Sequence, residues 1–384
     1  MRVLIVNNFL KNTLGGVENY LETLCSYSKK NDAEVIFRWY GVENTKTNWL
    51  QKFYNAKTTT EIIKEIDTFQ PDIIHCYSIG ATVTPHFMNY AKKKNIPIIH
   101  SYRDYYYICP KNYMLDTHGN VIVEHNHYLE CVLRHLPKKN FIYDSLLYWK
   151  QHYHKKFIKK YVDYFITPSE RLSEMITHEF RKPGETLPNP VLINTENIEI
   201  IEGEYLLYVG RLEPEKGVLT LLKAFQKVIE NFPQEKLIIV GSGSIQHLLE
   251  LYVRENNLTN VLFLGVKNKS NLKELYARAK FTIVPSEFLE SYGNVILESF
   301  ALKKAVIISD LLGIKNEVVE NNCGLVFPYG NISELQEAIE NLLTDTVLRK
   351  RFETNAAQYV SKLTFENHFL QLKEIYFRVI NKSF

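Results

Sequence analysis

Short apolar runs alternate with longer segments of helical periodicity along the whole chain. In the first half the runs predict strands at residues 2–7, 34–40, 72–77, 96–102 and 164–169. In the second half they predict strands at residues 205–210, 236–241, 260–265, 281–286, 305–310 and 324–327. Helical periodicity in the first half falls at residues 16–30, 60–69 and 80–94. Alternating strands and helices are typical of parallel sheets covered by helices, so the pattern predicts an α/β protein with two Rossmann-like halves.

The stretch 181–204 separates the two halves. It contains several prolines and few residues that favour a strand, which is typical of a linker. We therefore predict two domains, residues 1–186 and 187–364, with a hinge near this stretch. Apolar residues at helical spacing in the last segment predict a terminal helix within 365–384.

Composition narrows the functional classes. With 384 residues, 45% of them apolar and 23% charged, the chain is typical of a globular protein of two domains. The net charge of +3 does not indicate a general polyanion binder, and no nucleic-acid partner is expected. A charged n-region and a long apolar run are both missing from the sequence, so we expect a cytoplasmic protein. The five cysteines are scattered without a CxxC pair, which disfavours a disulfide framework or a zinc site.

Several common nucleotide motifs are missing from the sequence. No GxGxxG fingerprint follows a strand, which disfavours a nicotinamide dehydrogenase, and the P-loop motif GxxxxGK[ST] does not occur. A DxD-like carboxylate pair suited to a metal-bound nucleotide is missing as well. We therefore expect no cofactor and no metal.

Two segments of the first half point to binding partners. Residues 103–140 show neither the short apolar runs of strands nor helical periodicity, and they are rich in tyrosine and histidine. They are therefore a candidate for acceptor recognition. In the helical segment 141–161, Trp149, Tyr153 and two further aromatic residues are spaced four apart among five lysines. The segment therefore fits an anionic membrane surface, or a helix that covers the sheet with its lysines in solvent.

Glycines and cations occupy positions suited to phosphate. Gly15 and Gly16 open a helix after the first strand, and a helix N-terminus attracts anions. Arg211 and Lys216 follow a buried strand at a spacing that allows both to hold a diphosphate. Each feature has a structural alternative: a packing turn for the glycines, and loop charges paired with Glu213 or Glu215 for the cations.

Residues 285–298, "PSEFLESYGNVILE", place two carboxylates around a glycine turn. If a helix begins near Gly293, the backbone of residues 292–295 supplies free N–H groups, Glu290 precedes the helix and Glu298 lies about one turn into it. The two glutamates could accept hydrogen bonds from sugar hydroxyls, or act as the acid and nucleophile of a glycosidase. Structural roles at a helix start and a helix surface are the remaining alternative.

Read in order, "LGGVE" (14–18), "RDYYYICP" (103–110), "YVGRLEPEKG" (208–217) and the 285–298 block resemble the retaining glycosyltransferases of family 4, the glycosyltransferase group 1 class. The resemblance implies a GT-B fold, with two Rossmann-like domains facing a central cleft. The first domain would bind the acceptor and the second the nucleotide sugar, and the helix within 365–384 would pack back on the first domain.

The resemblance also assigns roles to single residues. Donor-binding roles fall on Gly15, Gly16, Arg211, Lys216, Gly265, Val266, Glu290, Ser291, Tyr292, Gly293, Asn294, Val295 and Glu298. Catalytic roles fall on Arg211, Lys216, Glu290, Arg103 and Asp104. Many members have a histidine near the donor sugar at this position, and in this chain Arg103 replaces it.

The implied activity is metal-independent sugar transfer, with retention, from a nucleotide diphosphate sugar to an acceptor hydroxyl. The expected acceptor is a glycan or lipid-linked glycan of bacterial surface polysaccharide such as lipopolysaccharide or capsule, met at the cytoplasmic face of the inner membrane. The alternatives are an inverting transferase, a sugar-nucleotide epimerase, and a catalytically silent module that binds a nucleotide sugar.

Overall fold

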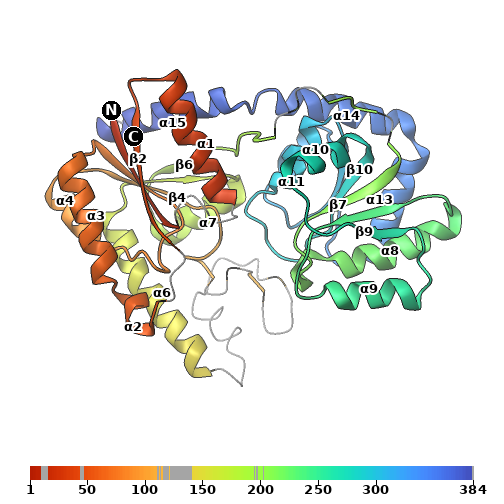
Figure 1. The fold of residues 1–384 in the computed structure, drawn as a ribbon, viewed down its shortest axis with the longest axis horizontal. Helices are drawn as coiled ribbons and strands as arrows, with labels where there is room; N and C mark the ends of the chain where they lie inside the picture. The colour runs from red at the N-terminus through yellow and green to blue at the C-terminus, as the bar shows by residue number, and fades with distance from the viewer. Residues whose placement is uncertain are drawn as a thin grey trace. The chain divides into compact units, whose positions relative to one another are not determined.

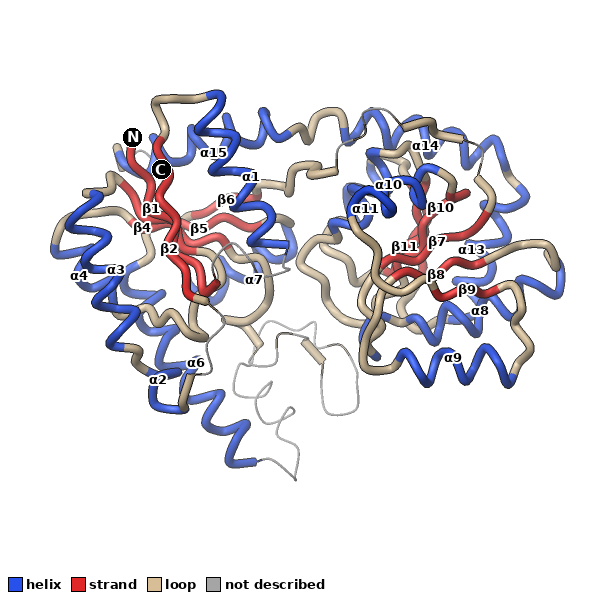
Figure 2. The backbone as a smooth tube through the Cα atoms, viewed as in Figure 1, coloured by secondary structure: helices blue, strands red, loops and turns tan. Residues whose placement is uncertain are grey.

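The computed structural model describes residues 1–9, 16–43, 47–109, 112, 114–115, 121, 141–193, 195, 198–201 and 203–382. Within this part the chain forms two compact units. Unit 1 consists of residues 1–188 with 368–384, and unit 2 consists of residues 189–367. Both are parallel α/β sandwiches, and both sheets can be followed in Figures 1 and 2.

Unit 1 is built on a six-stranded parallel sheet in the order β2-β1-β3-β4-β5-β6. Its strands are β1 (Arg2–Phe9), β2 (Ile36–Val42), β3 (Ile73–Cys76), β4 (Ile98–Ser101), β5 (Tyr164–Thr167) and β6 (Gly184–Thr186). Its helices are α1 (Gly16–Asn31), α2 (Trp49–Phe53), α3 (Ala56–Phe69), α4 (Phe87–Lys93), α6 (Phe141–Tyr161), α7 (Glu170–Phe180) and most of α15 (Phe365–Ile380).

Unit 2 has a second six-stranded parallel sheet in the order β12-β11-β10-β7-β8-β9. Its strands are β7 (Tyr205–Val209), β8 (Leu237–Val240), β9 (Val261–Phe263), β10 (Ala279–Val284), β11 (Ala305–Ser309) and β12 (Gly324–Phe327). Its helices are the 3-10 turn η1 (Pro214–Lys216), α8 (Val218–Asn231), α9 (Gln246–Glu255), α10 (Lys269–Ala277), α11 (Asn294–Ala301), α12 (Lys315–Glu320), α13 (Ile332–Thr344) and α14 (Thr346–Val360).

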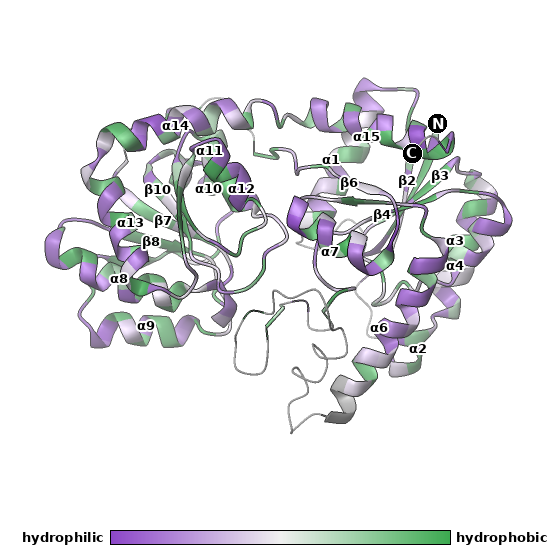
Figure 3. Ribbon diagram, turned by 180° about the vertical axis from the view of Figure 1, so that it is seen from behind, coloured by the Kyte–Doolittle hydropathy of each residue, from purple (hydrophilic) through white to green (hydrophobic). Residues whose placement is uncertain are grey.

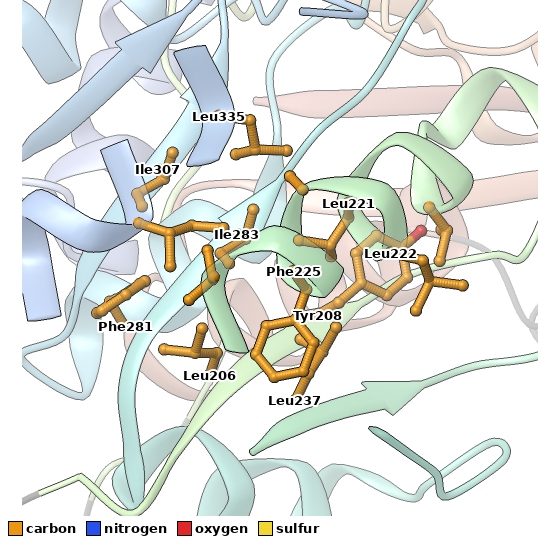
Figure 4. Close-up of a cluster of buried hydrophobic side chains, with 14 of the residues drawn as sticks. Leu206, Tyr208, Leu221, Leu222, Phe225, Leu237, Phe281, Ile283, Ile307 and Leu335 are labelled. Atoms are coloured by element: carbon orange, nitrogen blue, oxygen red, sulfur yellow. The ribbon is translucent and has the colours of Figure 1, made fainter. Parts of the chain in front are cut away.

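The core of unit 2 shows why the apolar runs become central strands. Leu206 on β7, Phe281 on β10 and Ile307 on β11 are fully buried against Phe225 of α8 (Figure 4). In Figure 3 the strands of both sheets are mostly in the hydrophobic colours, whereas the helices carry both colours. Strands buried on both faces read as continuous apolar runs, and this confirms the predicted fold class of parallel α/β layers.

Three details of unit 1 differ from the sequence prediction. Strand β6 was missed because Gly184–Thr186 has no apolar signal, and it pairs with β5 through its backbone. Gly184 is needed there because a Cβ would lie 2.4 Å from the ring of Phe165. The short helix α2 was also missed, and the helix predicted at 80–94 begins only at Phe87.

The terminal helix α15 packs on unit 1 through hydrogen bonds between distant segments. The Tyr376 hydroxyl lies 2.7 Å from His75 Nδ1, and His368 Nε2 lies 2.7 Å from the Tyr20 hydroxyl. His368 Nδ1 is 2.9 Å from the carbonyl oxygen of Pro188. A carbonyl only accepts, so Nδ1 carries the proton and Nε2 accepts from Tyr20.

Glycines close the loops that follow the strands of unit 2. A Cβ at Gly241 would lie 1.8 Å from the carbonyl oxygen of Gly210, and one at Gly243 would lie 2.2 Å from that of Leu212. These two glycines therefore allow the loops after β7 and β8 to pack on each other. Gly265 differs, since a Cβ there would meet no atom within 4 Å.

No helix among the described residues is both long enough and apolar enough to span a bilayer.

Candidate active site

The site in unit 2 centres on a close ion pair between two loops. Lys216 Nζ lies 2.7 Å from Glu290 Oε1, and the two side chains are only 17% and 14% exposed. The Ser286 hydroxyl donates a second hydrogen bond to the same Glu290 oxygen. Lys216 Nζ also lies 4.8 Å from the centre of the Phe288 ring. The pair brings together one cation and one carboxylate that the sequence placed 74 positions apart.

Backbone contacts hold these two loops together. The Glu287 N–H donates to the Glu215 carbonyl at 2.8 Å, and the Thr220 hydroxyl donates to the Glu287 carboxylate. Gly217, at the end of η1, has a φ of +67°, and its missing Cβ leaves room for the Pro285 carbonyl. The loops follow β7 and β10, which are neighbours in the sheet. Lys216 and Glu290 therefore meet at the carboxyl edge of two adjacent parallel strands, where open sheets bind ligands.

The loop contact at Gly217 gives a first prediction. Gly217→Ala should lower the free energy of unfolding of unit 2 by about 3 kcal/mol, because a left-handed alanine costs about 1–2 kcal/mol and its Cβ would lie 2.0 Å from Pro285 O. Gly265→Ala is the matched control, since φ there is +64° but the space is open, and it should cost about 1 kcal/mol. Urea unfolding followed by far-UV circular dichroism measures both. Equal losses would show that the two loops are not locked at this glycine.

Arg211 lies in the same loop but points elsewhere. Its Nη2 is 3.4 Å from Glu215 Oε1, and its side chain is 58% exposed. The structural alternative of a loop cation paired with Glu215 thus describes Arg211, whereas Lys216 faces Glu290. An exposed pair of this kind contributes only about 0–1 kcal/mol. Little free energy therefore opposes a turn of Arg211 toward a ligand.

Helix α11 begins at the predicted glycine turn. Its N-cap is Gly293, with φ +121° and no side chain to cap the helix. Val295 packs at the edge of a buried cluster, and Tyr292 is buried beneath the turn. Ser291 lies half-buried in the preceding loop, and Asn294 accepts a hydrogen bond from Asn189 at 2.7 Å. The turn therefore presents backbone N–H groups rather than side chains at the helix start.

Glu298 lies about one turn into α11, as predicted, and is half-buried. Its Oε2 accepts a hydrogen bond from the Tyr276 hydroxyl at 2.9 Å. Burial raises the pKa of Glu298, while this hydrogen bond opposes the rise. Val266, one of the predicted donor-binding residues, is 73% exposed.

The carboxylate partners Ser286 and Tyr276 were missed in the sequence. Ser286 stands four residues before Glu290, but nothing in the sequence marks it as a partner. Tyr276 comes from α10, 22 residues before Glu298. Ser286 lies inside the 285–298 block and Tyr276 outside it, and only the folded contacts identify either as a carboxylate partner.

In unit 1, Arg103 and Asp104 line a cavity of about 120 Å³. The guanidinium carbon of Arg103 lies 4.9 Å from the centre of the Tyr20 ring. Asp104 Oδ1 accepts the Tyr106 N–H at 3.0 Å, and burial raises the pKa of Asp104. Gly16 is the exposed first residue of α1. Gly15 lies outside the described residues, as does most of the predicted acceptor segment 103–140.

Two of the five lysines of helix α6 fit neither interpretation, whereas Lys156, Lys159 and Lys160 are exposed. Lys150 is 5% exposed, and its Nζ donates to the Gly80 carbonyl at 3.0 Å. Burial lowers the pKa of Lys150 to about 8. Lys155 is also buried and pairs with Glu179 at 2.7 Å. These two lysines therefore face the protein rather than solvent or a membrane.

Comparison with known proteins places these features in a family context. Residues 195–359 match the model of the family described as glycosyl transferases group 1. An uncharacterized glycosyltransferase of Methanocaldococcus jannaschii is 28% identical over 219 residues, which cover 56% of this chain and 61% of that protein. A capsular polysaccharide biosynthesis glycosyltransferase of Staphylococcus aureus is 26% identical over 181 residues, 46% of either chain. The chain thus spans about half to three fifths of the length of these relatives.

Solved structures extend the likeness to the whole fold. The Anabaena protein HepE, solved in complex with UDP, superposes with a TM-score of 0.71 at 15% identity and covers 98% of this chain and 99% of that one. This likeness concerns the arrangement of the backbone. The chain has the GT-B fold, and its second unit carries the sequence features of glycosyl transferases group 1.

Proposed function

We propose that this chain is a glycosyltransferase that moves a sugar from a nucleotide diphosphate to an acceptor hydroxyl. The observation that carries the proposal is the Lys216–Glu290 pair at the carboxyl ends of β7 and β10. It places a cation and a hydrogen-bond acceptor in the same unit as the glycine-capped start of α11. A diphosphate and the hydroxyls of its sugar need both kinds of group.

The proposed chemistry uses Lys216 as a fixed positive charge. Departure of the diphosphate builds negative charge, and the ammonium group with the N–H groups of α11 stabilises it. Glu290 accepts hydrogen bonds from the donor sugar, and its contact with Ser286 fixes the carboxylate orientation. The Arg211 guanidinium leaves Glu215 and donates two or more N–H hydrogen bonds to the diphosphate. We propose that the reaction proceeds with retention and that these groups replace a metal ion.

Ligand-dependent melting tests the nucleotide part of this proposal. UDP, GDP, ADP, CMP and dTDP are each added to the full chain, because a ligand that binds only the folded state raises the melting temperature. Turnover is then followed by NMR of the anomeric proton in the product, with and without EDTA. A product with the donor's anomeric configuration, formed in EDTA, supports retention without metal. Inversion or loss of activity in EDTA contradicts it.

The same measurements separate the alternatives. A nucleotide that binds without turnover across an acceptor panel indicates a silent binding module. Isomerisation of the sugar nucleotide without any acceptor indicates an epimerase. If none of the five nucleotides raises the melting temperature, the nucleotide-sugar function itself is contradicted.

Glu298 gives a second prediction. Glu298→Gln should weaken nucleotide binding about tenfold, because a hydrogen bond to a charged carboxylate contributes about 1.5 kcal/mol or more. We propose that Glu298 accepts a hydrogen bond from the nucleotide ribose, so the donor sugar preference should not change. Isothermal titration with the nucleotide that raises the melting temperature gives the affinity. Glu337→Gln on α13 is the exposed control, and an unchanged affinity for Glu298→Gln would remove the ribose role.

We also propose that the acceptor is a glycan or lipid-linked glycan of surface polysaccharide at the cytoplasmic face of a membrane. Trp149 is 61% exposed on α6, and Lys156, Lys159 and Lys160 are exposed on the same helix. An aromatic residue among exposed lysines suits an anionic lipid surface.

Flotation with phosphatidylglycerol vesicles tests this contact. Replacement of the three exposed α6 lysines by glutamine should abolish flotation, and phosphatidylcholine vesicles should not bind. The matched control replaces the exposed Lys223, Lys227 and Lys236 of unit 2 in the same way. Equal loss in both triple variants would indicate a general charge effect rather than a membrane-binding face.

A further inference from the structure

A buried polar contact joins the terminal helix α15 to α1. His368, where the chain returns to unit 1, is 4% exposed, and Tyr20 of α1 is 5% exposed. The Tyr20 hydroxyl lies 2.7 Å from His368 Nε2, and the two rings meet edge-on with their centres 5.4 Å apart. The hydroxyl and the imidazole therefore hold each other inside unit 1.

The tautomer of His368 fixes the direction of the Tyr20 hydroxyl. Because His368 Nδ1 donates to the Pro188 carbonyl, Nε2 has no proton and accepts the single proton of Tyr20. The lone pairs of the Tyr20 oxygen then face its other neighbours, and toward them the oxygen only accepts. A neighbouring side chain that carries donors and no acceptor matches this oxygen best.

Arg103 is a side chain of this kind and lies against Tyr20. Its guanidinium carbon is 4.9 Å from the centre of the Tyr20 ring and 5.9 Å from that of Tyr77. A guanidinium has five N–H donors and no acceptor. Burial raises the pKa of Tyr20, and Arg103 opposes that rise through its charge and a hydrogen bond. The Tyr20 oxygen thus donates toward His368 and accepts from Arg103.

The two tyrosine rings restrict where the guanidinium can lie. Their centres are 6.0 Å apart and their planes are inclined by 50°. Arg103 and Tyr77 both line the cavity of unit 1 at the carboxyl ends of its strands. A long arginine side chain loses much rotamer freedom when it is held in one direction, so such an orientation needs contacts that favour it. Tyr20 and Tyr77 supply those contacts.

From this geometry we propose that Tyr20 and His368 are positioning residues for Arg103. Pro188 fixes the proton of His368, His368 orients the Tyr20 hydroxyl, and the Tyr20 oxygen holds the guanidinium at the cavity. The inference rests on the proposed glycosyltransferase function, in which Arg103 takes the place of the histidine that many members have near the donor sugar. Arg103 keeps its working orientation only while the Tyr20–His368 hydrogen bond is intact.

A double-mutant cycle between Tyr20→Phe and Arg103→Met tests this role. Tyr20→Phe keeps the ring and removes only the hydroxyl. In the wild-type background it should lower kcat for sugar transfer about tenfold, which is the loss expected for one hydrogen bond to a charged group. In the Arg103→Met background it should leave kcat unchanged, because the group on which Tyr20 acts is already missing. Steady-state kinetics at saturating donor and acceptor gives kcat for all four proteins.

Variants of His368 test the next step of the chain of contacts. His368→Phe removes the acceptor for the Tyr20 hydroxyl and should lower kcat as Tyr20→Phe does. His368→Gln keeps an amide oxygen that accepts from Tyr20, so it should retain most of the wild-type kcat even though it lacks the ring. Equal losses of kcat in the two His368 variants would contradict positioning through the Tyr20 hydroxyl.

Urea unfolding of the same proteins gives a readout that needs no turnover. The change of midpoint in the Tyr20→Phe/Arg103→Met variant should be smaller than the sum of the two single changes, because both substitutions remove the same contact. Tyr164→Phe is the matched control. This buried tyrosine donates to Glu185 at 3.2 Å from the amino end of β5, whereas Arg103 follows the carboxyl end of the parallel strand β4. It should lower the midpoint and leave kcat unchanged.

The outcomes separate this inference from the proposed function. An equal fold loss of kcat from Tyr20→Phe in both backgrounds would overturn the positioning role and leave the glycosyltransferase function standing. Additive changes of the urea midpoint would overturn it as well, and so would a loss of kcat in Tyr164→Phe as large as that in Tyr20→Phe. If the wild type transfers no sugar from any donor, the proposed function fails, and the midpoint cycle alone decides whether Tyr20 holds Arg103.

Discussion

Replacing Lys216 with methionine is expected to lower kcat/KM for sugar transfer about a hundredfold or more. Lys216 is the half-buried cation beside Glu290, at the edge of the sheet where we place the departing diphosphate. Preorganised charges aimed at a developing anion are worth about 3–4 kcal/mol each in the transition state. Methionine keeps the length of the stem but removes the charge. Steady-state kinetics with the donor varied at saturating acceptor measures the loss.

Two control variants interpret that loss. Lys216→Arg keeps a positive charge and should retain more activity than Lys216→Met, while Lys223→Met on the exposed face of α8 should leave kcat/KM unchanged. Removing Lys216 leaves the Glu290 carboxylate without its ion-pair partner, so the free energy of unfolding of unit 2 is measured alongside. Activity of Lys216→Met within twofold of wild type would exclude this lysine from catalysis.

The sheets were predictable because they depend on local composition. Each buried parallel strand requires a short apolar run, and β7 to β12 all begin or end within two residues of the predicted bounds. Strand β6 has no such apolar run, so the sequence did not predict it. Gly184–Thr186 pairs through its backbone alone, and its glycine is set by Phe165, which lies in a different strand.

The candidate site was predictable only as a set of residue types at strand ends. The sequence placed Lys216, Glu290 and Glu298 in loops and a helix near one edge, but it could not show that Lys216 pairs with Glu290 while Arg211 pairs with Glu215. Such choices depend on how two loops pack, here through Gly217 and Pro285. Likewise, the burial of Lys150 depends on its contact with Gly80, which lies 70 residues earlier.

Histidines produce the other large expected effect, a loss of stability of unit 1 between pH 7 and pH 5. Burial lowers the pKa of His100 and His368 to about 3 and that of His86 and His154 to about 4, and it lowers the pKa of His75 well below its ordinary value. Below about pH 6.5 the unfolded chain therefore binds protons that the folded chain does not. Each such histidine should lower the free energy of unfolding by up to about 2 kcal/mol over this range. The raised pKa of Asp104 opposes this trend, because the folded chain then binds a proton that the unfolded chain has released.

The histidines with lowered pKa values and the tryptophans lie in the same unit, so the pH dependence of that unit's stability can be measured separately. All five histidines belong to unit 1, and His247, the one histidine between residues 189 and 367, is exposed. The three tryptophans also lie in the sequence of unit 1, so their fluorescence follows that unit alone, while far-UV circular dichroism follows both. Urea unfolding from pH 7.5 to 5 should therefore show a fluorescence midpoint that falls steeply with acid and a second transition that moves less.

His368 tests the cause of the pH dependence directly. Its Nδ1 donates to Pro188 and its Nε2 accepts from Tyr20, an arrangement that requires the neutral ring. His368→Gln should destabilise unit 1 at pH 7 but reduce the slope of its stability against pH by about one proton. His247→Gln is the control, because His247 belongs to unit 2 while the tryptophan fluorescence follows unit 1, so that slope should not change. A fluorescence midpoint of the wild type that stays constant down to pH 5 would contradict this account. The buried histidines would then accept protons in the folded state. Water would have to reach the interior of unit 1 more freely than the packing around α15 allows.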